Sequence, residues 1–192
     1  EGAQQLRKLA RGRKIVFSLG RMIPYKGFDN LILAARKLPD DYMVIIAGSG
    51  PLYKCLKELV HKNGLGNKVI MPGRISDKDR DALLGVSSVF VLPSVEKTEA
   101  YGIVLIEAMS AGVPVIATEI PGSGTSWVSE HGVSGLNVPV GSPGKLAEAI
   151  VKVCGDTVLY GRGARRRWET MFTGELFIDN ITSIYRELLE GV

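Results

Sequence analysis

The sequence is poor in the residues that build metal sites, disulfide frameworks and membrane spans. Its 192 residues include only 2 cysteines and 2 histidines, and neither a C-x-x-C nor an H-E-x-x-H pattern occurs, so we expect no metal site. Cys55 and Cys154 have no motif spacing, which favours buried free thiols in a reducing compartment. No apolar run reaches the roughly eighteen residues that cross a bilayer, and no signal peptide is recognisable.

The overall composition is that of an ordinary globular protein. Hydrophobic residues make up 45% and charged residues 23% of the chain, and its length suits one domain or one large lobe. The net charge of +4 permits an anionic ligand or a membrane surface without requiring either, and we expect no nucleic-acid partner. The chain begins Glu1-Gly2-Ala3 without a methionine, so we expect it to be a piece of a longer protein.

Short apolar runs alternate along the chain with segments of helical spacing. The runs that are typical of strands occupy 14–18, 42–47, 69–71, 89–92, 115–117 and 135–139. Helical spacing or capping residues predict helices over 27–38, from Pro51 onward, after Ser76, and over 102–112, 143–153, 158–172 and 174–189. Strands that alternate with helices favour a parallel sheet. We therefore expect an α/β fold, a Rossmann-like doubly wound parallel sheet of about six strands.

The segment 102–112 is the most unusual of the predicted helices. It is apolar almost all round, and such a helix is normally buried. Its single charge, Glu107, would then need a hydrogen-bonding partner, because a buried and unpaired carboxylate is costly. A second acid, Glu99, lies in the preceding loop with seven residues between the two. Gly102 at the helix start would let a ligand approach backbone N–H groups, at a helix end that attracts anions such as phosphate.

Glycines and charged residues follow the predicted strands. In a doubly wound sheet, ligands bind at the carboxyl ends of the strands. After the first five strands, in order, come Arg21 and Lys26, Gly48 and Gly50, Gly73 and Arg74, the loop 94–99, and the loop 122–125. We therefore expect a ligand site at this edge of the sheet.

The stretch 99–116 resembles the E-x7-E signature of retaining glycosyltransferases with the GT-B fold, most closely glycosyltransferase family 4. The positions in register with that family's pattern are Glu99, Tyr101, Gly102, Glu107, Ala108, Met109, Gly112, Pro114, Val115 and Ile116. The loop 20–27 has the form G-R-x-x-x-x-K-G, and 48–51 matches the family's G-x-G-P turn. The resemblance covers 14–189 and corresponds only to the C-terminal, donor-binding half of such an enzyme.

This resemblance implies a role for each matched position. Arg21 and Lys26 would hold the diphosphate of a nucleotide-sugar donor, Glu107 would accept hydrogen bonds from the ribose, and Glu99 would reach the sugar hydroxyls. These four form the predicted catalytic set. Further donor contacts are implied for three groups of residues. The glycines of the loops are Gly20, Gly48 and Gly50. The backbone beside the distal phosphate and the sugar is that of Ala100, Tyr101, Gly102 and Ile103, and the backbone beside the base is that of Arg74 and Ile75. No metal and no cofactor is implied.

The implied function is transfer of a sugar from a nucleoside diphosphate to a hydroxyl, with retention of configuration. It would serve polysaccharide, O-antigen or glycolipid synthesis in the cytoplasm. The full-length enzyme would be peripheral to a membrane, and at the membrane surface its acceptor would be a saccharide or a lipid-linked molecule. A missing N-terminal domain would bind it, so the fragment alone is expected to be inactive. A GT-B epimerase or phosphorylase with the same site, and a non-catalytic nucleotide-binding module, remain as alternatives.

The resemblance also implies how the chain is divided. Residues 1–13 would be a linker or N-terminal helix, 14–173 the nucleotide-sugar-binding domain, and 174–192 a helix that packs toward the missing domain. The family's usual G-G-x-x-E after the fifth strand is not kept here, because Trp127 stands at the position of the glutamate. This difference leaves the donor-sugar contacts open.

Two charged clusters allow a structural interpretation and a functional one. The arginines Arg162, Arg165, Arg166 and Arg167 favour a solvated helix face over a contact with anionic lipid. The acids of 77–81 match D-x-D, the metal motif of another glycosyltransferase fold. We interpret them as acids in the first turn of a helix, where they are electrostatically favoured.

Overall fold

The computed structural model describes residues 12–190. Six strands form one sheet in which all neighbours are parallel, in the order β3-β2-β1-β4-β5-β6. Their bounds are β1 (Lys14–Leu19), β2 (Tyr42–Ala47), β3 (Val69–Gly73), β4 (Val89–Leu92), β5 (Val115–Glu119) and β6 (Gly135–Pro139). The predicted doubly wound sheet is confirmed. The direction of strand addition reverses between β1 and β4, and that is where ligands bind in such sheets.

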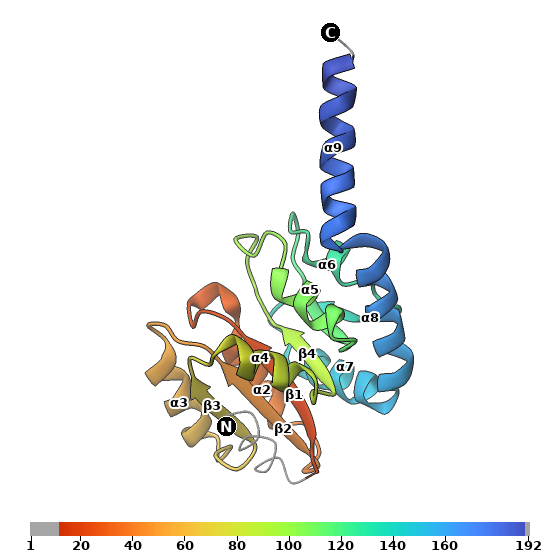
Figure 1. Cartoon of the computed structure of the whole chain (residues 1–192). Helices are drawn as coiled ribbons and strands as arrows, with labels where there is room; N and C mark the ends of the chain where they lie inside the picture. The colour runs from red at the N-terminus through yellow and green to blue at the C-terminus, as the bar shows by residue number, and fades with distance from the viewer. Residues whose placement is uncertain (1–11, 191–192) are drawn as a thin grey trace.

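Helices cover both faces of the sheet, as Figure 1 shows. They are η1 (Pro24–Lys26), α2 (Phe28–Ala35), α3 (Tyr53–Lys62), α4 (Asp77–Leu84), α5 (Ile103–Ser110), α6 (Thr125–Val128), α7 (Pro143–Gly155), α8 (Thr157–Met171) and α9 (Gly174–Glu190). Alternate strand residues face opposite sides of a sheet. Val16 therefore joins the core beneath α2, α3 and α7, whereas Ile15 and Phe17 join the core beneath α4 and α5.

The start of α3 differs from the prediction. Pro51 was expected at the first helical position, but α3 begins at Tyr53. The Leu52 amide donates to the carbonyl oxygen of Met22 at 3.1 Å, across to the loop after β1. The Tyr53 amide donates to the carbonyl oxygen of Gly50 at 3.1 Å, so residues 50–53 form a turn from which α3 then starts. The short elements η1 and α6 were not predicted either, because each lies in a loop.

The two cysteines differ in environment. Cys154 is buried in the core, as predicted, and burial raises the pKa of its thiol to about 12. Cys55 is exposed on α3, so the expectation of two buried thiols was wrong. Both are free.

Helix α9 projects from the rest of the molecule, at the dark blue end of the chain in Figure 1. Its apolar side chains Phe177, Ile181, Ile184 and Leu188 are exposed. That this face packs on a missing domain stays a prediction, as does the division into 1–13, 14–173 and 174–192; 1–11 and 191–192 lie outside the described residues. Among residues 12–190, no helix has both the length and the apolar character that crossing a membrane requires.

Candidate functional site

The loops that follow β1 and β2 are packed backbone against backbone. The Gly20 amide donates to the carbonyl oxygen of Ala47, and the Met22 amide donates to that of Ser49, at 3.1 and 2.9 Å. A Cβ added at Gly48 would lie 1.9 Å from the carbonyl oxygen of Gly20, and one at Gly50 would lie 2.5 Å from that of Met22. Only glycine permits this approach, and Gly48 and Gly50 thereby hold in place the loop that carries Arg21.

The loops after β1 and β4 meet where the strand order reverses. Lys26 Nζ lies 2.5 Å from Glu99 Oε2, although the two residues are 73 apart in sequence. Their side chains are 11% and 10% exposed. Ser94 Oγ donates to the same carboxylate oxygen at 2.7 Å. Glu99 is therefore a buried carboxylate that is both paired and hydrogen-bonded, which is the condition under which such a charge is tolerated.

Glu107 is less buried than predicted. Leu105, Ala108 and Met109 of α5 face the sheet, but the first residue of the helix, Ile103, is 67% exposed and the Glu107 side chain is 35% exposed. The prediction of a helix buried all round was wrong, because α5 begins at the rim of the sheet and only one of its faces is covered. The expectation that Glu107 has a partner is confirmed, since Arg80 Nη1 lies 3.5 Å from Glu107 Oε1.

Arg80 on α4 is shared among three acids. It lies 3.1 Å from Asp77 Oδ1 and 2.9 Å from Asp81 Oδ1, as well as near Glu107. The hydrogen bond to Asp81 raises the pKa of Arg80 above its ordinary value, and the charge of Glu107 adds to this. Ser76 Oγ accepts from the Asp79 amide at 3.1 Å, so the predicted cap of α4 is confirmed.

The N-terminus of α5 is open toward the same rim. Gly102 precedes it with φ 78°, and a Cβ there would lie 2.8 Å from Leu92 Cδ2, so this position requires glycine. Among the described residues, no side chain caps this helix. The Leu105 amide donates to the carbonyl oxygen of Gly102 at 2.8 Å, so the amides of Ile103 and Val104 are the ones available to an anion.

The remaining predicted residues lie on the loops around this centre. Arg21, Arg74, Ala100 and Tyr101 are exposed, and Ile75 is half-buried. The Arg21 side chain forms no ion pair with residues 12–190. The structure thus brings Lys26 and Glu99 into contact and places Glu107 beside Arg80. It leaves Arg21 without an ion pair among the described residues.

The family model "Glycosyl transferases group 1" matches residues 4–169. The chain belongs to this family. It is 34% identical over 185 residues to the O-antigen chain mannosyltransferase C of Escherichia coli, covering 94% of this chain and 48% of that protein. It is 37% identical over 165 residues to the D-rhamnosyltransferase WbpZ of Pseudomonas aeruginosa, covering 84% and 42%.

Among solved structures, Anabaena Alr3699/HepE in complex with UDP superposes on this group 1 chain with a TM-score of 0.84 and 25% identity. The match covers 99% of this chain and 52% of HepE. The chain therefore spans about half the length of the relatives it matches. The prediction of the Rossmann-like C-terminal half of a GT-B glycosyltransferase is confirmed.

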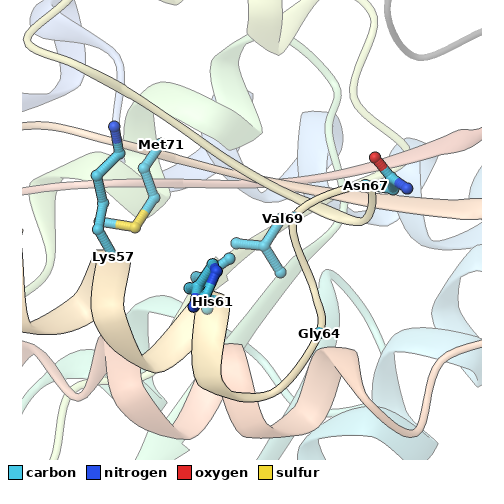
Figure 2. Close-up of a pocket in the computed structure, with 8 residues that line it drawn as sticks. Lys57, His61, Gly64, Asn67, Val69 and Met71 are labelled. Atoms are coloured by element: carbon cyan, nitrogen blue, oxygen red, sulfur yellow. The ribbon is translucent and has the colours of Figure 1, made fainter.

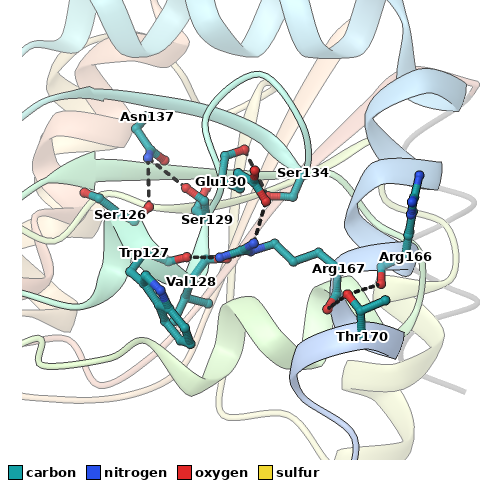
Figure 3. A network of polar contacts seen from close by, with 10 residues as sticks. All are labelled: Ser126, Trp127, Val128, Ser129, Glu130, Ser134, Asn137, Arg166, Arg167 and Thr170. Atoms are coloured by element: carbon teal, nitrogen blue, oxygen red, sulfur yellow. Dashed lines mark hydrogen bonds and ion pairs between the residues drawn. The ribbon is translucent and has the colours of Figure 1, made fainter.

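The group 1 chain has an aromatic cluster where the family's usual glutamate was expected. Trp127, 52% exposed, lies with its ring centre 6.1 Å from that of Tyr101 and 5.6 Å from that of Phe172. Figure 3 shows Arg167 reaching beneath this loop from α8. Its Nε donates to the Val128 carbonyl oxygen at 2.8 Å, and it also donates to that of Trp127.

The predicted solvated face of α8 was therefore wrong for Arg167, whereas the Arg165 side chain is 48% exposed, as predicted. Arg167 is only 12% exposed and pairs with Glu130 at 2.5 Å, and it braces the loop before β6. Arg165 donates to the Ser110 carbonyl oxygen at 2.5 Å and ties α8 to α5. A long cation buries well when carbonyl oxygens satisfy its donors, and sequence alone does not reveal those partners.

A cavity lies between α3 and β3, away from the predicted site residues. Lys57 and His61 from α3 and Val69 and Met71 from β3 line it, as Figure 2 shows. None of the residues predicted to bind a donor lines this cavity. This cavity is therefore not where the predicted chemistry lies.

The sequence did not reveal two side chains that contact the glutamates, Ser94 beside Glu99 and Arg80 beside Glu107. Ser94 is an ordinary loop serine, and nothing in its pattern indicated that it bonds Glu99. Arg80 carried a signal, because it stands between Asp77, Asp79 and Asp81, but the acids drew attention as a D-x-D match and the arginine did not.

Proposed function

We propose that this chain is the donor-binding half of a retaining glycosyltransferase of family 4, which transfers a sugar from a nucleoside diphosphate to a hydroxyl acceptor. The observation that carries the proposal is the contact between Lys26 and Glu99 beside the uncapped start of α5. A cation and a helix N-terminus suit a diphosphate, and a carboxylate suits sugar hydroxyls.

The diphosphate is the leaving group, and it gains negative charge as the bond to the sugar breaks. Lys26, Arg21 and the first amides of α5 would stabilise that charge without a metal or a cofactor. Arg21 is exposed and free of acidic partners among the described residues, so its guanidinium is available to a phosphate.

The two carboxylates would bind and orient the donor. Glu99 would accept hydrogen bonds from the sugar, and Glu107 from the ribose. The backbone of 100–103 would lie beside the distal phosphate and the sugar, and the backbone of Arg74 and Ile75 beside the base. Retention of configuration is part of the proposal through family 4, and no residue of this chain is assigned as a nucleophile.

The relatives favour a hexose and a polysaccharide acceptor. Two of them are named as a mannosyltransferase of O-antigen chains and a D-rhamnosyltransferase, and HepE was crystallised with UDP. In the full-length enzyme, a further N-terminal domain would bind a saccharide or lipid-linked acceptor at the cytoplasmic surface of a membrane. The exposed apolar face of α9 would pack on that domain.

Calorimetric titration of the chain with UDP, GDP and ADP, each with and without EDTA, tests the proposal. We expect one diphosphate to bind, with an affinity that EDTA leaves unchanged and that exceeds the affinity for its nucleoside. Binding that EDTA abolishes, or equal affinities for nucleoside and diphosphate, would contradict the assigned site.

Arg21→Ala isolates the diphosphate contact. We expect about a tenfold loss of diphosphate affinity and less than a twofold change for the nucleoside, because a charged hydrogen bond to phosphate contributes more than 1 kcal/mol. Lys54→Ala, which removes an exposed cation from α3, is the matched control and should change neither affinity.

A further inference from the structure

Arg80 lies next to Glu107 but belongs to a different element and to none of the matched motifs. It comes from α4, which follows the loop of Arg74 and Ile75, and Glu107 comes from α5. Arg80 Nη1 and Glu107 Oε1 are 3.5 Å apart, with side chains 25% and 35% exposed. The contact therefore joins the predicted base-binding loop region to the predicted ribose-binding carboxylate.

We propose that Arg80 is a positioning residue that orients Glu107 toward the ribose and thereby makes the chain prefer ribonucleotides over deoxyribonucleotides. The inference rests on the proposed function, in which Glu107 accepts hydrogen bonds from the ribose hydroxyls. It adds to that function the residue that makes the carboxylate selective.

The guanidinium also contacts two acids of its own helix. Arg80 Nε donates to Asp81 Oδ1 at 2.9 Å, and Nη1 donates to Asp77 Oδ1 at 3.1 Å. Both acids belong to the same helix as Arg80, so α4 carries the cation and the groups that hold it. The Arg80 side chain is 25% exposed, and its contacts with these two carboxylates limit where the planar guanidinium can present its remaining donors to Glu107.

The carboxylate of Glu107 is left half satisfied. Oε1 faces Arg80, whereas Oε2 has no hydrogen-bond partner within residues 12–190. Each carboxylate oxygen has room for about two hydrogen bonds, so Oε1 can keep Arg80 and still accept from a hydroxyl. A held Glu107 thus presents acceptors for two neighbouring hydroxyls, at a site next to the open start of α5.

Fixing the carboxylate affects selectivity as well as affinity. A free glutamate side chain loses rotamer entropy when it binds a ligand. Because Arg80 already restricts Glu107 before binding, much of that entropic cost no longer falls on the binding step. A ligand that lacks one hydroxyl leaves a held acceptor unpaired, whereas a mobile carboxylate could turn back to water. Removing Arg80 should therefore weaken the ribonucleotide much more than its deoxy analogue.

The test is calorimetry with GDP and UDP and with their 2′-deoxy analogues, on the wild-type chain, Arg80→Ala and Arg80→Lys. For whichever base binds, we expect Arg80→Ala to lower ribonucleotide affinity about tenfold and deoxynucleotide affinity less than twofold. Arg80→Lys keeps the charge but loses the fork, and we expect an intermediate loss of discrimination.

Two further variants separate positioning from other effects. Glu107→Ala should remove the preference for the ribonucleotide, and adding Arg80→Ala to it should cause no further loss, because the two act as one unit. Lys78→Ala removes an exposed cation from the same helix and should leave the preference intact. Urea unfolding of each variant shows that the chain is folded under the conditions of the titration.

The outcomes distinguish the inference from the function beneath it. If the wild-type chain binds none of the diphosphates, the proposed function and the role of Arg80 are both overturned. If it binds one and Arg80→Ala lowers ribonucleotide and deoxynucleotide affinity equally, Arg80 acts on the phosphates or on the fold, and the inference is overturned while the proposed function stands. If Arg80→Ala changes neither affinity, the inference is likewise overturned.

Discussion

The two glutamates of the E-x7-E stretch occupy opposite kinds of environment. Glu99 is buried, with Lys26 at 2.5 Å and Ser94 on the same oxygen. Glu107 is half-exposed, with one oxygen 3.5 Å from Arg80 and the other without a hydrogen-bond partner among residues 12–190. One motif therefore contains a buried carboxylate that already has two partners inside the protein and a half-exposed carboxylate that has one.

The difference teaches that the spacing of two acids does not say which of them supports the fold. A buried ion pair strongly destabilises a protein when one partner is removed, because the other charge is left without compensation. A half-exposed pair contributes little, because water replaces the lost partner. Glu99 and Lys26 should thus matter for stability and for binding, whereas Glu107 and Arg80 should matter mainly for binding.

Lys26→Met is the largest test of this comparison. It leaves Glu99 buried without its cation, and we expect the free energy of unfolding to fall by about 3–5 kcal/mol. Urea denaturation measures the change. Lys54→Met, at an exposed position of α3, is the control. A loss below about 1 kcal/mol would show that water already compensates Glu99.

Glu99→Gln tests the same pair from the other side and should have a smaller effect. The amide retains an acceptor for Ser94 and for the Lys26 ammonium but removes the negative charge. We expect about 2 kcal/mol of destabilisation, because a charged hydrogen bond becomes a neutral one. A loss equal to that of Lys26→Met would mean that burial of the lysine, rather than of the carboxylate, dominates.

Arg80→Ala should separate binding from stability. We expect the free energy of unfolding to fall by less than about 1 kcal/mol, because the pair with Glu107 is partly exposed and screened by solvent. The same protein should show the loss of ribonucleotide preference described above. A destabilisation comparable to that of Lys26→Met would show that the Arg80–Glu107 pair supports the fold as much as the Lys26–Glu99 pair does.

The smallest expected effect is that of salt on the stability differences between the wild-type chain and these variants. Raising the ionic strength from about 0.1 M to about 1 M shortens the Debye length from about 10 Å to about 3 Å and screens exposed charges more than buried ones. The stability difference between wild type and Arg80→Ala should therefore nearly vanish, while that of Lys26→Met persists. Urea unfolding curves at both salt concentrations measure these two differences. If salt reduced both of them equally, the assigned burial of the Lys26–Glu99 pair would be contradicted.

Much of the fold could be predicted because the pattern is local. Strands such as β2 and β6 are short apolar runs with clear ends, and their predicted bounds agree with the structure. The Ser76 cap is also local, since the hydroxyl and the amide that it binds are three residues apart. The predicted helix start at Pro51 was wrong because residues 50–53 form a turn, and the Leu52 amide ties this turn to the loop after β1, which lies far away in sequence.

The candidate site was predicted only in its residue types. Glu99, Lys26 and Glu107 were named from spacing and resemblance, but Glu107 was expected to be buried and no burial was predicted for Glu99. Burial depends on which loops fold over a side chain, and Lys26 reaches Glu99 from 73 residues away. The same reason explains why Arg80 and Ser94 were missed.

By itself, the sequence determined the order of strands and helices, the family, and the kinds of side chain at the carboxyl edge of the sheet. These follow from periodicity, capping and motif spacing, which act over a few residues. Only the tertiary structure decided that Glu99 is neutralised by Lys26, that Glu107 stays open beside Arg80, and that Arg167 serves as a brace rather than a surface charge. Charges are tolerated or exposed according to their neighbours in space, and those neighbours come from distant segments whose meeting depends on the packing of the whole domain.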